Sequence, residues 1–286
     1  MTASDLLGEA ASRLREAGIE AADWDAERLL RHVLGWERAV LLAQPEAEIA
    51  DEAETCFRRL LAERARRVPL QHLVGTQAFW RHDFVVNPDV LVPRPETELL
   101  VEVALERMRD LARPLAVDVG TGSGCIALSL ADARPDAEVH ASDLSAEALA
   151  VARENAVRLG LERRVRFHAG DLLDPVAALA GRFDLVVSNP PYVAAEERES
   201  LAPEVRDHEP AVALFAPERG LGVHRRLAAA AAGALRAGGV LVVELGAGQQ
   251  AAVEGFCTGA GLAVSEVRAD LQSIPRALVA VKPTPC

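Results

Sequence analysis

The chain has 286 residues, of which 50% are hydrophobic and 26% are charged, and its formal net charge is −12. This composition is typical of a globular protein with a sizeable core, and no apolar run approaches the roughly 18 residues that a membrane span needs. The acidic balance argues against an extended contact with nucleic acid, because phosphate binding needs clustered lysine and arginine. We therefore expect neither a membrane partner nor direct nucleic-acid binding.

The cysteines and the N-terminus indicate a cytoplasmic protein. Cys56, Cys125, Cys257 and Cys286 lie far apart without a CxxC spacing, which argues against a zinc ribbon or a disulfide framework and fits a reducing compartment. The seven histidines show no paired-ligand spacing, so the sequence predicts no metal site. The first residues carry acids in an amphipathic pattern and lack the basic and apolar regions of a secretion signal.

Three amphipathic stripes predict a helical N-terminal domain over residues 1–73. Apolar residues recur at helical spacing in Leu7 to Leu14, in Ala26 to Leu34 and in Ala53 to Val68, and each stripe ends near a glycine or a proline. The arginine-rich stretch from Arg58 to Arg67 follows acidic residues in the same predicted helix. We interpret it as a solvated face that complements the helix dipole rather than as a nucleic-acid patch.

The amino-acid composition changes after this predicted helical domain. Residues 74–95 are rich in aromatic, β-branched and proline residues, which predicts a short hairpin and a linker. Residues 96–286 then alternate between apolar runs and helix-like stretches such as Ala146 to Leu159 and Val223 to Leu235. The predicted strands are Leu115–Val119, Glu138–Ser142, Val165–Ala169, Phe183–Ser188 and Val240–Leu245, with a closing pair at Ala263–Val267 and Ala277–Val281. This pattern predicts an α/β domain with a mostly parallel sheet covered on both faces and an antiparallel edge hairpin.

A glycine loop follows the first predicted strand. Gly120, Gly122 and Gly124 open the next helix, and Thr121 and Ser123 stand between them. Glycines there let the backbone approach a ligand closely, and a helix N-terminus favours a negative group. The spacing is GxGxG and not the GxGxxG of dinucleotide-binding folds.

Carboxylates surround this loop at the same edge of the predicted sheet. Asp118 precedes the first glycine and would repel a pyrophosphate but favour an ammonium group, while Asp143 ends the second strand, where an acid can accept from ribose hydroxyls. Asp171 and Leu172 follow the third strand. Taken singly, Asp143 is as well explained as a helix cap and Asp171 as a turn residue. Together they favour a nucleoside attached to an amino acid.

The fourth strand ends in Asn189, Pro190, Pro191 and Tyr192. Proline holds the preceding residue in an extended conformation and has no backbone N–H, so this loop presents acceptor oxygens with few competing donors. Such a cluster suits a substrate NH2 group, and Tyr192 could stack on the planar group that carries it. A rigid turn that merely ends the strand is the simpler alternative, which the glycine loop and Asp143 upstream make less attractive.

With these motifs the sequence resembles a class I methyltransferase that uses S-adenosylmethionine, and more closely the HemK or PrmC family. That family methylates the side-chain amide of the glutamine in the GGQ tripeptide of class I peptide chain release factors. The resemblance covers nearly the whole chain, and its most specific parts are "FW" (79–80), "VLVPRPETELLVE" (90–102), "VGTGSGCIAL", "SNPPYV", "HEPAVALF" (208–215) and "GLGVHRRL".

The resemblance implies a cofactor site and a substrate site that share one loop. Gly120 to Gly124 would line the methionine and ribose of the cofactor, Asp143 would hold the ribose hydroxyls, and Asp171 with Leu172 would border the adenine. Asp118 and Asn189 complete the predicted cofactor-binding set. Leu172 departs from the aromatic residue found in some relatives.

The substrate side is implied by the same likeness. Asn189 and the carbonyl of Pro190 would accept the two amide protons of the glutamine, Tyr192 would pack on the amide plane, and Pro191 would complete the substrate-binding loop. Asn189, Pro190 and Tyr192 are accordingly the predicted catalytic residues. The N-terminal helices would help to dock the protein substrate.

Three other functions remain open from the sequence. A ribosomal protein glutamine methyltransferase is the nearest, although that group tends to depart from "PRPETE". An adenine amino methyltransferase on nucleic acid would use an NPPY loop equally well, but the acidic charge and the lack of a basic recognition domain argue against it. A nucleotide-binding regulatory module without catalysis would have no need for an NH2 cradle.

Overall fold

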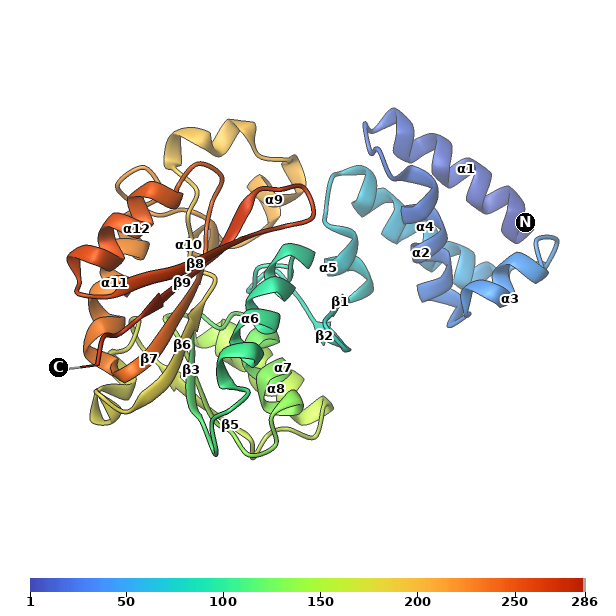
Figure 1. The fold of residues 1–286 in the computed structure, drawn as a ribbon. Helices are drawn as coiled ribbons and strands as arrows, with labels where there is room; N and C mark the ends of the chain where they lie inside the picture. Colours follow the sequence, from blue (N-terminus) through green and yellow to red (C-terminus); the bar gives the residue numbers. More distant parts are fainter. Residues whose placement is uncertain (285–286) are drawn as a thin grey trace. The chain divides into compact units, whose positions relative to one another are not determined.

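The computed structural model describes residues 1–284, and their contacts form two compact units, whose elements are labelled in Figure 1. The first unit comprises Met1–Thr76 together with the short segment Ala202–His208. The second comprises Gln77–Leu201 and the chain from Glu209 onward. The domain bounds 1–73, 74–95 and 96–286 stay a prediction. The contacts differ from them in two respects: they group residues 77–95 with the second unit, and they add the short segment 202–208 to the helical unit.

The first unit is a bundle of helices around one apolar core, as the three stripes predicted. Its helices are α1 (Ala3–Glu16), α2 (Ala22–Leu34), α3 (Arg38–Ala43), α4 (Asp51–Ala65), α5 (Leu70–Val74) and α9 (Pro203–His208). Thr2 begins α1 with a capping box, since its hydroxyl accepts from the backbone N–H of Asp5. Gly35 ends α2 in the left-handed conformation at φ 63°. Leu6, Leu29 and Phe57 are fully buried in this core.

A buried ion-pair network joins α9 to the rest of this unit. The Arg64 guanidinium donates to Asp25 over 2.7 Å and to Glu204 over 2.9 Å, and Arg67 donates to Glu204 over 2.8 Å. The solvated face predicted for this arginine-rich stretch is therefore wrong for Arg64, which is only 6% exposed. Arg64 is buried because two carboxylates on other helices satisfy its donors.

The second unit is built on one seven-stranded sheet, which confirms the predicted fold class. Its strand order is β5-β4-β3-β6-β7-β9-β8, parallel from β5 to β7 and antiparallel at β9 and β8. The strands are β3 (Leu115–Val119), β4 (Glu138–Asp143), β5 (Val165–Ala169), β6 (Phe183–Ser188), β7 (Leu235–Glu244), β8 (Ala263–Ala269) and β9 (Pro275–Val281). The predicted hairpin is the separate pair β1 (Thr76–Phe79) and β2 (His82–Val85).

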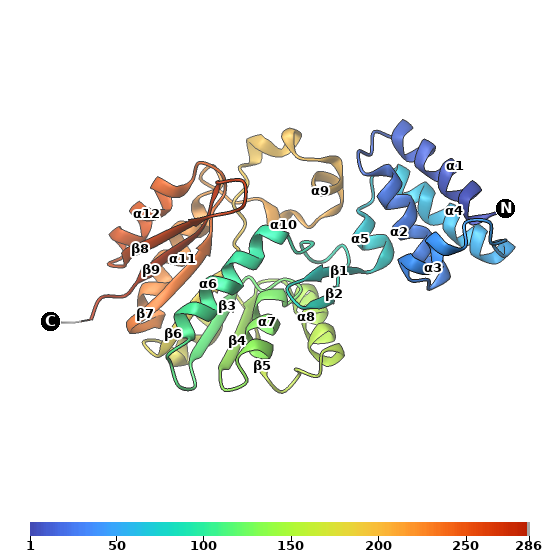
Figure 2. The ribbon, with the colours of Figure 1, turned by 45° about the vertical axis from the view of Figure 1, so that its right-hand side comes forward.

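Helices cover both faces of this sheet (Figures 1 and 2). The helices α6 (Glu98–Met108), α7 (Cys125–Ala133) and α8 (Ala146–Arg158) lie on one face, and α11 (Gly222–Ala234) and α12 (Gln250–Gly259) lie on the other. Two separate apolar clusters result, one containing Leu100 and Leu128 and the other containing Leu227 and Val253. Short helices complete the connections: η1 (Pro95–Thr97), η2 (Asp174–Leu179), η3 (Ala195–Ser200) and α10 (Ala211–Leu214).

The chain order places the predicted motifs at one edge of the sheet. From β3 the chain runs outward through β4 and β5 and then returns to β6 on the other side of β3. Val119 of β3 pairs with Ser142 of β4 and with Ser188 of β6, so these three residues lie level across the sheet. The glycine loop, Asp143 and Asn189 each follow directly after one of them. Ligands bind at such a switch point, at the carboxyl ends of the strands.

Two further expectations bear on the described part of the chain. Within residues 1–284 no helix has both the length and the apolar character needed to cross a membrane. Cys56, Cys125 and Cys257 are free thiols. The fourth cysteine, Cys286, lies outside the described residues.

Candidate active site

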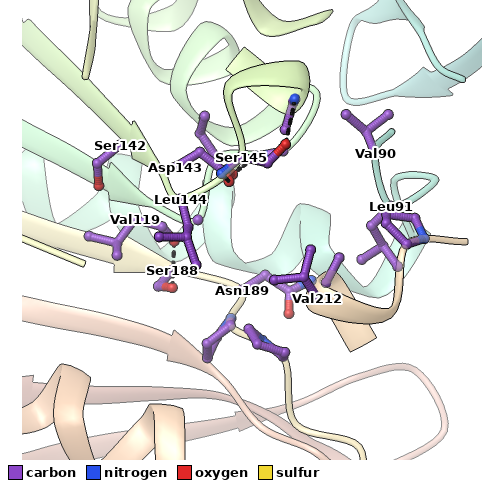
Figure 3. Close-up of a pocket in the computed structure, with 18 of the residues that line it drawn as sticks. Val90, Leu91, Val119, Ser142, Asp143, Leu144, Ser145, Ser188, Asn189 and Val212 are labelled. Atoms are coloured by element: carbon purple, nitrogen blue, oxygen red, sulfur yellow. Dashed lines mark hydrogen bonds between the residues drawn. The ribbon is translucent and has the colours of Figure 1, made fainter. Parts of the chain in front are cut away.

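A cavity of about 240 Å³ opens at the carboxyl edge of the sheet. The residues after β3, β4, β5 and β6 line it, together with segments around 89–97 and 210–215. Figure 3 shows Asp143, Leu144 and Ser145 on one wall and Leu91 and Val212 on another, with Asn189 beside Val212. All of these residues belong to the second unit, and the cavity therefore lies wholly within it.

The glycine loop lines part of the cavity and leaves open space beside its backbone. Gly120 and Gly122 have φ angles of 72° and 56°, a region that favours glycine, and an added Cβ at either would meet no atom within 4 Å. Gly120 and Thr121 donate their backbone N–H groups to the Ser142 carbonyl over 2.8 and 3.0 Å. The loop is thus fixed to β4 while leaving room for a ligand above it. Thr121 and Ser123 line the cavity as well.

Asp118 lies beneath this loop and does not line the cavity. Its Oδ2 accepts from the Thr121 hydroxyl over 2.7 Å and from the backbone N–H of Ala127 over 3.2 Å. Burial raises the pKa of the Asp118 carboxyl to about 7, and no described residue donates to its Oδ1. In this structure the side chain supports the loop, and its contact with a cofactor stays a prediction.

Asp143 lies in the cavity wall with both carboxylate oxygens held by backbone donors. Gly122 donates to its Oδ2 over 2.8 Å and Ser145 donates to its Oδ1 over 2.9 Å. The N-cap of α8 is Ser145, whose hydroxyl accepts from Ala148, so Asp143 is not needed as the cap. Burial raises the pKa of the Asp143 carboxyl, whereas these two backbone bonds favour its charged form. Each oxygen keeps a lone pair for a ligand hydroxyl.

Asp171 and Leu172 line the next part of the wall. Asp171 pairs with Arg226, a cavity residue on α11 that the sequence did not single out. Leu172 adopts a positive φ of 46°, and its carbonyl accepts from the Ser142 hydroxyl over 2.7 Å. The structure therefore brings the three predicted carboxyl-edge segments, 120–124, 143 and 171–172, to one cavity.

The loop after β6 places Asn189, Pro190 and Pro191 in the same cavity. The Asn189 Nδ2 donates to the Thr97 hydroxyl over 3.1 Å. No described residue donates to the Asn189 Oδ1, which is left as an acceptor in the cavity wall. The sequence analysis expected an acceptor for a substrate NH2 group at this position, and that role of Asn189 stays a prediction.

Tyr192 is directed elsewhere. It does not line the cavity, and its hydroxyl donates to Glu244 Oε1 over 3.3 Å. Burial and the neighbouring carboxylate raise the pKa of Tyr192, so it stays a donor at neutral pH. A half-buried tyrosine needs a partner for its hydroxyl, and Glu244 supplies one. Stacking of Tyr192 on a substrate amide stays a prediction.

Several site residues were missed at the sequence level. Thr97 and Arg94 line the cavity from the "PRPETE" segment, and the Arg94 guanidinium donates to both oxygens of the buried Glu209 over 2.7 and 2.8 Å. Glu244 ends β7 and accepts from the Thr97 hydroxyl over 2.7 Å. An acid that ends an apolar strand was the available signal for Glu244, by the same reasoning that identified Asp143.

Gly220 holds the loop that carries Tyr192. Its φ is 83°, and an added Cβ would lie 2.2 Å from the Tyr192 carbonyl oxygen. We expect Gly220→Ala to lower the free energy of unfolding by about 2 to 3 kcal/mol. The matched control is Gly181→Ala, where φ is 75° and no atom lies within 4 Å, so that only about 1 kcal/mol is lost. Urea denaturation measures both, and equal losses would show that the close approach to Tyr192 is unimportant.

The glycine loop, the carboxylate that ends β4 and the NPPY loop, on a seven-stranded sheet with an antiparallel edge, define a class I methyltransferase. Two family models match, the "PrmC N-terminal domain" at residues 5–75 and the "Methyltransferase small domain" at residues 95–205. The release factor glutamine methyltransferase of Deinococcus radiodurans is 48% identical over 245 residues, 86% of each chain. That of Cereibacter sphaeroides is 45% identical over 285 residues, 99% of each chain. The chain belongs to the release factor glutamine methyltransferase family.

A solved structure agrees on the fold. The methyltransferase from Pyrococcus furiosus superposes with a TM-score of 0.54 at 18% identity, over 78% of this chain and 100% of that chain. At this identity the likeness concerns the methyltransferase fold alone.

Proposed function

We propose that this enzyme transfers a methyl group from S-adenosylmethionine to the side-chain amide nitrogen of the glutamine in the GGQ motif of class I peptide chain release factors. One observation carries the proposal: the Asn189 Oδ1 is an unused acceptor in the wall of the cavity that also holds the glycine loop and Asp143. Relatives that match almost the whole chain carry the corresponding name. A release factor acts in the cytoplasm, so we place the enzyme there.

The residues of the cavity fit S-adenosylmethionine. Open space above Gly120 and Gly122 admits a ligand against the backbone, and the Asp143 carboxylate can accept from ribose hydroxyls. Leu144 and Leu172 offer apolar surface for a base. When bound, S-adenosylmethionine supplies a methyl group on a positively charged sulfur. The acidic side chains around the loop suit a cationic ligand better than a pyrophosphate.

The residues of the enzyme must position a weak nucleophile, the nitrogen of the glutamine amide. The nitrogen of an amide attacks poorly because its lone pair is delocalised, so orientation and polarisation must lower most of the barrier. The Asn189 Oδ1 and the Pro190 carbonyl accept hydrogen bonds from the two N–H groups of the glutamine amide. This raises the electron density on the amide nitrogen. With S-adenosylmethionine bound, the new N–C bond would form as its S–C bond broke, and the electron pair of that bond would stay on sulfur. The alkylated amide is strongly acidic and loses its proton to water, so no dedicated carboxylate base is required.

The test uses labelled S-adenosylmethionine with three separate acceptors: a class I release factor, total ribosomal protein and DNA. We expect label in the release factor alone, at the glutamine of its GGQ motif, and no label in a release factor with glutamate at that position. Label confined to ribosomal protein or to nucleic acid would overturn the proposed substrate. Mass spectrometry of the tryptic peptide locates the added methyl group.

A further inference from the structure

A chain of hydrogen bonds runs from the cavity into the core of the second unit. The Asn189 Nδ2 donates to the Thr97 Oγ1 over 3.1 Å, and the Thr97 hydroxyl donates to the Glu244 Oε2 over 2.7 Å. The Tyr192 hydroxyl donates to the Glu244 Oε1 over 3.3 Å. Thr97 and Glu244 are only 2% and 1% exposed, so bulk water does not compete for these bonds.

The direction of these bonds determines which end of the Asn189 amide faces the cavity. A threonine hydroxyl has one proton, and here that proton is committed to Glu244. Thr97 can therefore offer only lone pairs to Asn189, which requires the NH2 end of the amide to face Thr97. The amide oxygen is left to face the cavity. The opposite orientation would present a donor to the donor groups of the substrate.

We propose that Thr97 and Glu244 are positioning residues that hold the Asn189 carboxamide with its oxygen toward the substrate amide. This inference rests on the proposed function for the identity of that substrate. Neither residue needs to touch the reacting atoms: Glu244 orients Thr97, and Thr97 orients Asn189. The backbone of Glu244 is itself fixed, because the His224 ring donates to its carbonyl over 2.8 Å.

The charge on Glu244 determines the direction in which the Thr97 hydroxyl donates its hydrogen bond. Burial raises the pKa of the Glu244 carboxyl to about 7, while Thr97, Arg276 and Tyr192 favour its charged form and Glu96 opposes it. Burial raises the pKa of the nearby Cys125 thiol, and the carboxylates of Asp118 and Glu244 raise it further. A neutral Glu244 can donate to Thr97, which frees the threonine proton to turn toward the Asn189 oxygen. The fraction of molecules in which Asn189 directs its amide oxygen toward the cavity is therefore expected to decrease as the pH falls through about 7.

The kinetic test compares three variants at about pH 8.5, where most molecules carry an ionised Glu244. Thr97→Val keeps the shape but removes the hydroxyl, and we expect kcat to fall about 100-fold while the KM for S-adenosylmethionine stays close to that of the wild type. Thr97→Ser restores the hydroxyl and most of kcat. Glu244→Gln keeps an acceptor but loses the fixed polarity, so its kcat lies between those of the wild type and Thr97→Val. The matched control is Ser129→Ala, which removes a buried hydroxyl that has no described partner and leaves kcat unchanged.

A second readout needs no substrate. In nitrogen-15 NMR spectra the side-chain NH2 of Asn189, assigned by its absence from Asn189→Ala, should show one hydrogen-bonded, exchange-protected proton in the wild type and in Thr97→Ser. Thr97→Val should lose this signature. Lowering the pH through about 7 should shift the signal in the wild type and not in Glu244→Gln.

The two readouts separate the two hypotheses. If wild-type enzyme leaves the release factor unmethylated, the proposed function is wrong, and the NMR comparison still decides whether Thr97 orients Asn189. If Thr97→Val keeps both the protected Asn189 proton and the wild-type kcat, the positioning role is wrong whatever the substrate is. Loss of kcat in Thr97→Ser equal to that in Thr97→Val would also contradict it.

Discussion

Replacing Asn189 with alanine should lower turnover about 1,000-fold or more while the affinity for S-adenosylmethionine stays near that of the wild type. The variant removes the acceptor that faces the cavity, and the Pro190 carbonyl alone cannot hold both N–H bonds of the substrate amide. It leaves the glycine loop, which follows the neighbouring strand β3, and Asp143, which ends β4, unchanged. Single-turnover methylation of a release factor and calorimetric titration of S-adenosylmethionine measure the two quantities.

The control for this variant is Ser129→Ala, a buried substitution on α7 that removes no described hydrogen bond. It should keep both turnover and affinity. Unchanged methylation by Asn189→Ala would remove the basis of the mechanism. A parallel loss of cofactor affinity would instead show that Asn189 acts mainly in cofactor binding.

The second large effect is expected at Asp143. Asp143→Ala removes the carboxylate from the cavity wall and also the acceptor of the Gly122 N–H. We expect the affinity for S-adenosylmethionine to fall about 100-fold, because the ribose hydroxyls and the loop both lose a charged acceptor. Saturating S-adenosylmethionine should recover most of kcat, since Asp143 has no role in holding the glutamine amide.

Two comparisons sharpen this result. Asp143→Asn keeps an acceptor oxygen without the charge and should fall between the wild type and Asp143→Ala. Asp174→Ala removes an exposed acid that does not line the cavity, and it should bind S-adenosylmethionine normally. Equal affinities of wild type and Asp143→Ala would mean that the cofactor does not occupy this wall.

Much of the fold could be predicted because its signals are local. The strands β3 and β6 begin and end at the residues that their apolar runs predicted, since buried parallel strands need apolar side chains on both faces. The bounds of the edge strand β5 were predicted as well, although only its first residue is buried. Their order in the sheet then placed Asn189 beside the glycine loop, which the pairing of Val119 with Ser188 confirms. The start of β7 at Leu235 was missed because two glycines, at 238 and 239, interrupt its apolar pattern.

The rest depends on contacts between distant residues. Asn189 lies 92 residues from Thr97, and Thr97 lies 147 residues from Glu244, so no periodicity links them. The helix α9 has six residues, too few for an amphipathic pattern, and its place in the helical unit rests on the Arg64 and Arg67 ion pairs. The direction of the Tyr192 ring likewise depends on a buried partner that sequence patterns do not reveal.

The central claim is that the Asn189 Oδ1 and the Pro190 carbonyl line the space next to the transferable methyl group. A crystal structure of the enzyme with S-adenosylmethionine measures this directly. We expect the methyl carbon within about 5 Å of both oxygens, which leaves one amide nitrogen between them at hydrogen-bond and near-attack distances. A bound cofactor whose methyl group faces away from Asn189 would contradict the account.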